Sequence, residues 1–173
     1  MDFLELAKTR YSVREYEEKK VEKEKLYKIL EAARVAPSAV NNQPYRLIVV
    51  ESEEGLAKIE EGARLYKAPL AIIVCKVTEE AWCRKYDGKN HGDIDVSIVT
   101  DHMMMEATDL GLGTLWICWF KPEVIRKNFQ IPEGIEPVNI LAVGYAKDGK
   151  KGDVYRHETM RKKPEETVKY ETF

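Results

Sequence analysis

The stretch from Ile94 to Trp119, IDVSIVTDHMMMEATDLGLGTLWICW, decides how the rest of this chain is interpreted. Its apolar residues first recur at helical spacing up to Leu110 and then form a short apolar run from Thr114 onward. Gly111 stands where a glycine commonly ends a helix, because glycine adopts the left-handed backbone conformation without strain. The stretch therefore predicts a long helix that turns into a strand.

Further helices and strands are expected on both sides of this stretch. Asp2 can cap a first helix that ends near Lys8, and helical spacing predicts a second helix over residues 22–34, which Pro37 closes. The remaining predictions are a strand over 45–50, a helix from Ser52 to about Arg64, a strand over 69–77, a polar irregular stretch over 78–92, a helix over 122–129 and a strand over 138–145. This order predicts an α+β fold with helices packed on a sheet.

Length and charge narrow the classes of protein. The 173 residues fit one domain, residues 1–173, in which residues 146–173 form an extended charged tail. Charged residues make up 34% of the chain, but the formal net charge is only -2. Because the Lys and Arg residues are interleaved with acids, we expect no nucleic-acid partner, which would require a concentrated basic surface.

Apolar runs and cysteines point to a cytoplasmic protein. No run approaches the roughly 20 apolar residues that span a bilayer, and the first residues lack the features of a signal peptide. The three cysteines, Cys75, Cys83 and Cys118, show no metal-ligand spacing. We therefore expect reduced thiols, no metal site and no membrane association.

A basic segment, Arg10-Tyr11-Ser12-Val13-Arg14, follows the first expected helix. Two guanidinium groups and a hydroxyl can satisfy several oxygens of a phosphate, and loop N–H groups are available to an anion. The alternative is that Arg10 and Arg14 only keep the surface soluble. Alone, the segment is a weak phosphate motif.

A second segment, Pro37 to Pro44, combines small residues with amides. Asn41 and Gln43 supply donors and acceptors suited to the edge of a heterocycle, and the small residues 37–39 allow backbone to approach a ring closely. The alternative is an ordinary turn between a helix and a strand.

A third segment, Gly111-Leu112-Gly113-Thr114, follows the long helix. It is no Rossmann fingerprint, because the glycines follow a helix and the third glycine is missing. No phosphate-binding P-loop occurs in the sequence either. The segment could simply stop the helix and turn the chain.

The order and spacing of the three segments resemble the flavin-dependent nitroreductase family. That family has an Arg-x-Ser-x-Arg loop after the first helix, a Pro-Ser-x-x-Asn-x-Gln-Pro loop before the first strand, and Gly-Leu-Gly-Thr-x-Trp-Ile after the central helix. The resemblance runs from about Phe3 to Tyr145, and Met160 to Glu166 looks like the family's closing basic segment. It implies a three-layer fold in which helices flank a central, mostly antiparallel sheet.

The resemblance also implies a homodimer with FMN bound at the subunit interface. Arg10, Ser12 and Arg161 would hold the phosphate and ribityl chain, and Arg14 would lie near the pyrimidine edge and tune the potential. The second loop would come from the partner subunit. The full set of expected cofactor-binding residues is Arg10, Tyr11, Ser12, Arg14, Pro37, Ser38, Ala39, Asn41, Gln43, Trp116, Ile117, Cys118 and Arg161.

The implied activity is that of an FMN-dependent oxidoreductase. It would pass a hydride from NADH or NADPH through flavin N5 to a small nitroaromatic or quinone-like acceptor by a ping-pong mechanism, with no catalytic side chain. His91, His102 and His157 are scattered and indicate no nucleophile–base pair. The alternatives are flavin storage with little turnover, and reductive dehalogenation or flavin fragmentation. Residues 82–91 are expected to form either a substrate-facing lid or a polar surface loop.

Overall fold

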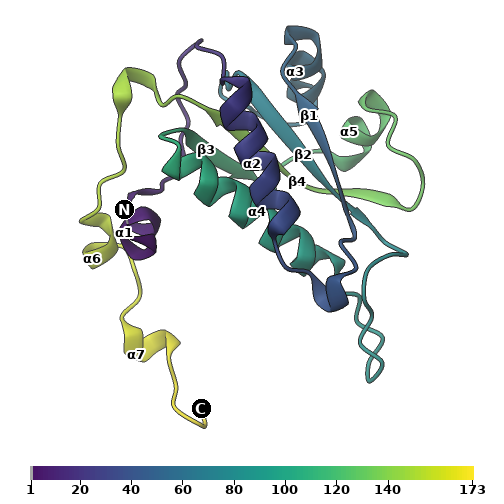
Figure 1. Cartoon of the computed structure of the whole chain (residues 1–173). Coiled ribbons are helices and arrows are strands. Elements are labelled where there is room, and N and C mark those ends of the chain that lie inside the picture. The colour runs from purple at the N-terminus through teal and green to yellow at the C-terminus, as the bar shows by residue number, and fades with distance from the viewer. Residues whose placement is uncertain (1) are drawn as a thin grey trace.

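The computed structural model describes residues 2–173 and shows helices on both sides of one sheet (Figure 1). The helices are α1 (Phe3–Thr9), α2 (Lys23–Val35), α3 (Glu53–Glu60), α4 (Gly92–Asp109), α5 (Pro122–Asn128), α6 (Arg156–Thr159) and α7 (Pro164–Thr167), with short 3-10 turns η1 (Ala39–Asn41) and η2 (Lys147–Gly149). The strands are β1 (Tyr45–Val50), β2 (Leu70–Val77), β3 (Gly113–Ile117) and β4 (Ile135–Gly144). None of the helices within residues 2–173 has the length and apolar character needed to cross a bilayer.

The four strands form a single sheet in the order β1-β2-β4-β3. Every neighbouring pair is antiparallel. Side chains of the central strand β2 alternate between two cores: Leu70 and Ile72 face one, whereas Ala71 and Ile73 face the other. This alternation follows from the two-residue period of a strand and leaves both faces of the sheet apolar.

Different helices cover the two faces. Leu26 and Ile29 of α2 join Val99 of α4 in the core on one side, and Ile59 of α3 joins Ile125 of α5 on the other. The expected three-layer α+β fold with an antiparallel sheet is therefore confirmed.

Two boundaries differ from the sequence prediction. Helix α3 ends at Glu60 rather than near Arg64, and the chain then turns at Gly62, where a Cβ would lie 3.2 Å from Val124 of α5. Strand β4 begins at Ile135 rather than Val138. A bulge opposite Val74 and Cys75 lets β4 carry Pro137, although proline cannot donate to the ladder.

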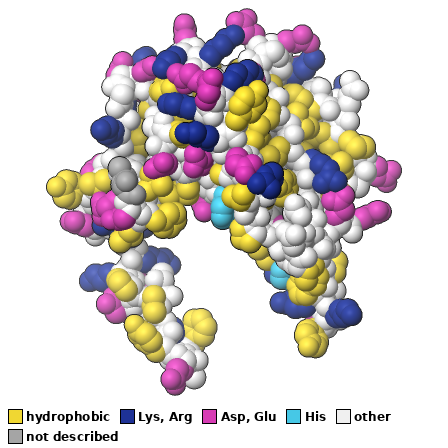
Figure 2. Space-filling model, viewed as in Figure 1, with side chains coloured by type: hydrophobic (Ala, Val, Ile, Leu, Met, Phe, Trp, Pro, Cys, Tyr) yellow, Lys and Arg dark blue, Asp and Glu magenta, His cyan; other side chains and the backbone are white. Residues whose placement is uncertain are grey.

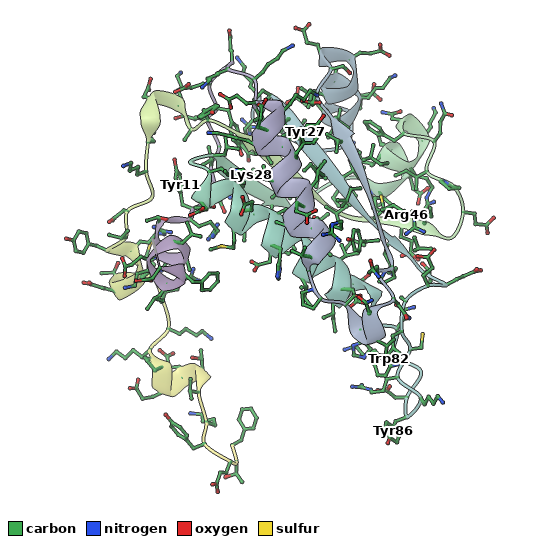
Figure 3. All side chains as sticks on the ribbon, viewed as in Figure 1. Tyr11, Tyr27, Lys28, Arg46, Trp82 and Tyr86 are labelled. Atoms are coloured by element: carbon green, nitrogen blue, oxygen red, sulfur yellow. The ribbon has the colours of Figure 1, made fainter. Side chains whose placement is uncertain are left out.

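Two segments project from the body on the same side (Figures 1 and 2). One is the stretch 78–91, which forms an ordered hairpin with a bridge between Cys83 and Asn90. Tyr86 lies at its tip, away from the body (Figure 3). The other is the tail after Met160, whose residues are all exposed and include Tyr170 and Phe173. Figure 2 shows a hollow between the two projections.

Candidate functional site

The basic segment lies along the start of β3, at the C-terminal end of α4. Arg10 ends α1, and Ser12 then forms a parallel bridge with Thr114, where the Val13 N–H donates to the Thr114 carbonyl oxygen at 2.9 Å. Val13 is buried in the sheet core, whereas Arg14 is exposed. Because side chains alternate in extended chain, Ser12 and Arg14 face away from that core.

The C-terminal part of the chain adds cations to this segment. Arg156 of α6 donates to the carbonyl oxygens of Arg10 and Lys8, and His157 Nε2 lies 3.0 Å from the latter. The pKa of Arg10 is lowered by burial first and then by the positive charges of Arg156 and Arg161. Three guanidinium groups therefore share one small region, and we call Arg10, Arg156 and Arg161 the arginine cluster.

The arginine cluster has no ion-pair partner among the described residues: within residues 2–173, no carboxylate makes an ion pair with any of its three guanidinium groups. Asp101 is the acid whose charge acts on Arg10, in the opposite direction to the arginines. Arg156 is engaged by backbone carbonyl oxygens, but the positive charge gathered around Arg10 and Arg161 is suited to an anion with several oxygens.

A cavity of about 460 Å³ opens beside Arg10 and Tyr11. The turn from Gly111 to Thr114 forms one wall, and the chain from Tyr145 to Val154 contributes another. Thr114 is among its lining residues, but the Thr114 hydroxyl itself is buried and has no hydrogen-bond partner among the described residues. Open space therefore lies directly beside Arg10.

The second predicted segment forms a tight, exposed loop after α2. Val40, Asn41 and Gln43 all have left-handed backbone conformations, with φ of 47°, 58° and 51°. The Ser38 hydroxyl accepts from the Gln43 N–H at 2.9 Å, and Asp95 of α4 accepts from the Ala39 N–H at 2.8 Å. The side chains of Pro37 and residues 40–43 face solvent.

The third segment exposes fewer side chains than the sequence suggested. Ile117 is buried in the sheet core, so only its backbone could reach a ligand. Cys118 is exposed and is not part of a disulfide. The strand ends at Ile117, and Trp119 beyond it is 94% exposed. Trp116 lies against the outer side of α4, in a groove with Ile98 and His102.

The structure brings two of the three segments together and separates the other. The basic segment bridges β3 at Thr114, just past the end of α4, whereas the loop contacts Asp95 in the first turn. About 14 helical residues separate Asp95 from Asp109, which corresponds to roughly 20 Å along the helix axis. The arginine cluster and this loop therefore lie toward opposite ends of α4 in one chain.

Helix α4 is apolar on its outer side as well as toward the sheet. Val96, Val99 and Met103 are buried against the sheet, whereas Ile94 is 46% exposed and Ile98 lines a surface groove. A helix that is hydrophobic on both sides is normally covered on both sides. The hollow between the hairpin and the tail lies on this part of the molecule (Figure 2).

Sequence analysis missed three residues that the structure places near the predicted segments. Arg156 sits in the tail, which has no apolar periodicity, so nothing linked it to Arg10. Asp95 occupies a position in a helix where an acid usually faces solvent, yet it is 2% exposed. Trp119 was included only as the end of a strand. The basic segment near the C-terminus was the one feature of the sequence that pointed to cations from the tail, and it led to the prediction of Arg161 but not of Arg156.

Comparisons with known proteins find one family. A family model described as "Nitroreductase family" matches residues 7–64 and 60–145. A provisionally named NADH dehydrogenase/NAD(P)H nitroreductase of Methanothermobacter thermautotrophicus is 39% identical over 153 residues, which cover 84% of this chain and 78% of that protein. The crystal structure of a nitroreductase family protein from Clostridium difficile 630 has a TM-score of 0.97 and 51% identity, with 100% of both chains covered. An FMN-dependent nitroreductase from Clostridium difficile R20291 has a TM-score of 0.82 and 27% identity, covering 99% of this chain and 100% of that one.

Proposed function

This chain belongs to the nitroreductase family, and from that premise we propose that it is an FMN-dependent oxidoreductase that uses NADH or NADPH. The names of its relatives support this activity, since one similar protein is named for NAD(P)H and nitroreduction and another for FMN dependence. The side chains described above suit a bound electron carrier, because they provide ligand contacts and charge and contain no nucleophile–base pair.

The arginine cluster carries the cofactor proposal. A phosphate monoester bears nearly two negative charges at neutral pH and offers three acceptor oxygens. Arg10 and Arg161 provide forked donors for it, and Ser12 faces away from the core on the same segment. The adjacent cavity beside Arg10 provides the space. The residues present thus fit the phosphate end of FMN.

The separation of the loop from the arginine cluster favours a homodimer. A second copy related by a two-fold axis would bring the loop of one chain to the basic segment of the other, and would cover Ile94 and Ile98. Two equivalent sites would result, each built from both chains. Ser38, Ala39, Asn41 and Gln43, with Pro37, would then approach the flavin from the partner subunit.

The remaining residues would orient the flavin and adjust its reactivity. The exposed guanidinium of Arg14 would stabilise negative charge at the pyrimidine edge, which favours the reduced form. Trp116, the Ile117 backbone and Cys118 would line the side from which N5 is reached. When bound, the cofactor would supply hydride transfer from NAD(P)H and then, after NAD(P)⁺ has left, reduction of a small oxidised acceptor such as a nitroaromatic or a quinone.

Absorbance of the purified protein tests the proposal. The protein is expected to be yellow, to release FMN on denaturation, and to bleach when it is mixed anaerobically with NADH or NADPH. Addition of a nitroaromatic or quinone should restore the colour at the expense of one equivalent of donor. Colourless protein that takes up no added FMN would overturn the cofactor assignment. Flavin that neither donor bleaches would instead support storage.

A further inference from the structure

Asp95 is a buried carboxylate whose hydrogen-bond donor lies outside its own helix, in the loop after α2. It lies in the first turn of α4 and is 2% exposed. Its Oδ1 accepts the Ala39 N–H at 2.8 Å, and its Oδ2 has no hydrogen-bond partner among the described residues. It takes part in none of the ion pairs within residues 2–173, whereas the neighbouring Asp93 pairs with Lys76 at 3.0 Å. An acid is therefore kept inside the protein without a counterion, in contact with the loop.

The loop that it holds is strained. Val40 has φ of 47°, and a β-branched residue is an outlier in the left-handed region. Asn41 and Gln43 share that region, although asparagine tolerates it better. Conformations of this kind persist only where the surroundings over-determine them, and they concentrate at functional sites.

Four side-chain hydrogen bonds hold the loop, and their partners lie in different parts of the molecule; one of them joins Gln43 to the Asn41 carbonyl oxygen within the loop. The Ser38 hydroxyl bonds within the loop itself, and Asn42 donates to the carbonyl oxygen of Glu80 at the base of the projecting hairpin. Asp95 is fixed in the long helix that packs on the sheet. Among these side-chain hydrogen bonds of the described residues, the Asp95 contact alone comes from a buried residue of the core.

We propose that Asp95 is a positioning residue, whose buried carboxylate holds the strained loop 38–43 in the shape that the flavin site requires. The assignment rests on the proposed function for the identity of the ligand, but the contact itself does not. The location suits the charge, since the N-terminal end of a helix stabilises an anion through its free N–H groups and dipole. A loop released from Asp95 would relax toward ordinary backbone conformations, and its amides would leave their positions.

Amide hydrogen exchange of the ligand-free protein tests, without any flavin, whether Asp95 holds the loop; we call this Asp95–Ala39 contact the clamp. Asp95→Ala should expose the Ala39 N–H and raise its exchange rate at least tenfold, together with neighbouring loop amides. Asp95→Asn keeps an acceptor oxygen and should restore most of the protection. Asp93→Ala is the matched control, because it removes an acid from the same turn without touching the loop. Unchanged Ala39 exchange in Asp95→Ala would overturn the proposal.

Titration of the apo-dimer with FMN then links the clamp to the site. Asp95→Ala should weaken FMN binding about tenfold, the effect of losing one buried hydrogen bond, whereas Asp95→Asn should bind nearly as well as the wild type. If Asp95 had only a structural role, Asp95→Ala would lower the melting temperature, but the two variants would not differ in FMN affinity. If the wild-type protein bound no FMN, the proposed function would be wrong. The exchange experiment would still show whether Asp95 holds the loop.

Relief of the strain provides a second variant. Glycine adopts the left-handed region freely, so Val40→Gly should recover part of the FMN affinity that Asp95→Ala loses. The same substitution in the wild-type background should change affinity little, because Asp95 already fixes the loop. Additive effects of the two changes in a double-mutant cycle would contradict the proposed coupling.

Discussion

The two ends of α4 build their parts of the site by different means. At the C-terminal end, the chain is extended and unstrained, and the arginine cluster supplies charge. At the N-terminal end, the side chains are neutral amides and small groups, and the backbone itself is strained around Val40. One end is suited to a phosphate by its charge, and the other is suited to a flat ring by its shape.

This difference is the basis for the proposed dimeric site. The charged end is built from residue charge, since Arg10 follows α1, Ser12 joins the edge of β3, and Arg156 comes in from the tail. The shaped end depends on a distant residue, Asp95, and lies roughly 20 Å away along α4. A second copy is the simplest way to bring both kinds of surface to one ligand.

The largest expected effect comes from separating the two copies. Ile98→Glu places a charge on the outer side of α4, where desolvation against a partner is costly. We expect a monomer in analytical ultracentrifugation and FMN binding weakened about a thousandfold or more, because the two ends no longer meet. The fold should survive, since Ile98 lines a surface groove in the single chain.

A control for this variant is available on the other side of the sheet. Leu56 of α3 is also half-buried, and Leu56→Glu introduces the same charge against the core that contains Ile59. This control should lower stability and leave the dimer and its FMN affinity intact. A monomeric Ile98→Glu protein that binds FMN normally would show that one chain holds a complete site.

A smaller effect is expected when the charged end alone is changed. Arg10→Ala removes a charge-assisted, forked contact and should weaken FMN binding about a hundredfold, with the dimer preserved. Fluorescence titration gives the affinity. Riboflavin lacks the phosphate, so Arg10→Ala should bind riboflavin with nearly the same affinity as the wild-type protein does. Arg34→Ala serves as the control, because Arg34 is paired with Glu31 on an exposed face of α2. Equal losses for FMN and riboflavin would place Arg10 away from the phosphate.

The same contrast explains what sequence could and could not predict. Helical spacing, Gly111 and the apolar run at 69–77 sufficed to predict helices packed on a sheet, because they depend on local periodicity, whereas the three layers and the antiparallel pairing came from the family resemblance. The Arg10–Arg14 segment could be predicted from the sequence, because the charge of a side chain follows directly from its residue type. Strain at Val40 and the burial of Asp95 were not, since backbone conformation and long-range contacts leave no local pattern. Arg156 was missed for a related reason: its contact with Arg10 spans nearly the whole chain.

The smallest expected effect concerns the network that supports the charged end. Lys25 Nζ donates to the Leu110 carbonyl oxygen at the end of α4 and to the Tyr145 hydroxyl, which in turn donates to Glu22. Hydrogen bonds from Tyr145 and then Lys19 lower the pKa of Glu22 to about 2.

Because this carboxylate has a lower pKa in the folded protein than in the unfolded chain, its contribution to stability is complete above pH ~4.5 and disappears as the pH falls toward 2. Urea unfolding between pH 2 and 6 should therefore show a shallower loss of stability for Glu22→Gln than for the wild type, and Tyr145→Phe should flatten the curve in the same way. Glu133→Gln, on an exposed turn, is the control and should retain the wild-type slope. If both network variants kept the wild-type dependence of stability on pH, Glu22 would not support this end of α4. If amide exchange at Ala39 also changed in these variants, the two ends would be coupled through the helix.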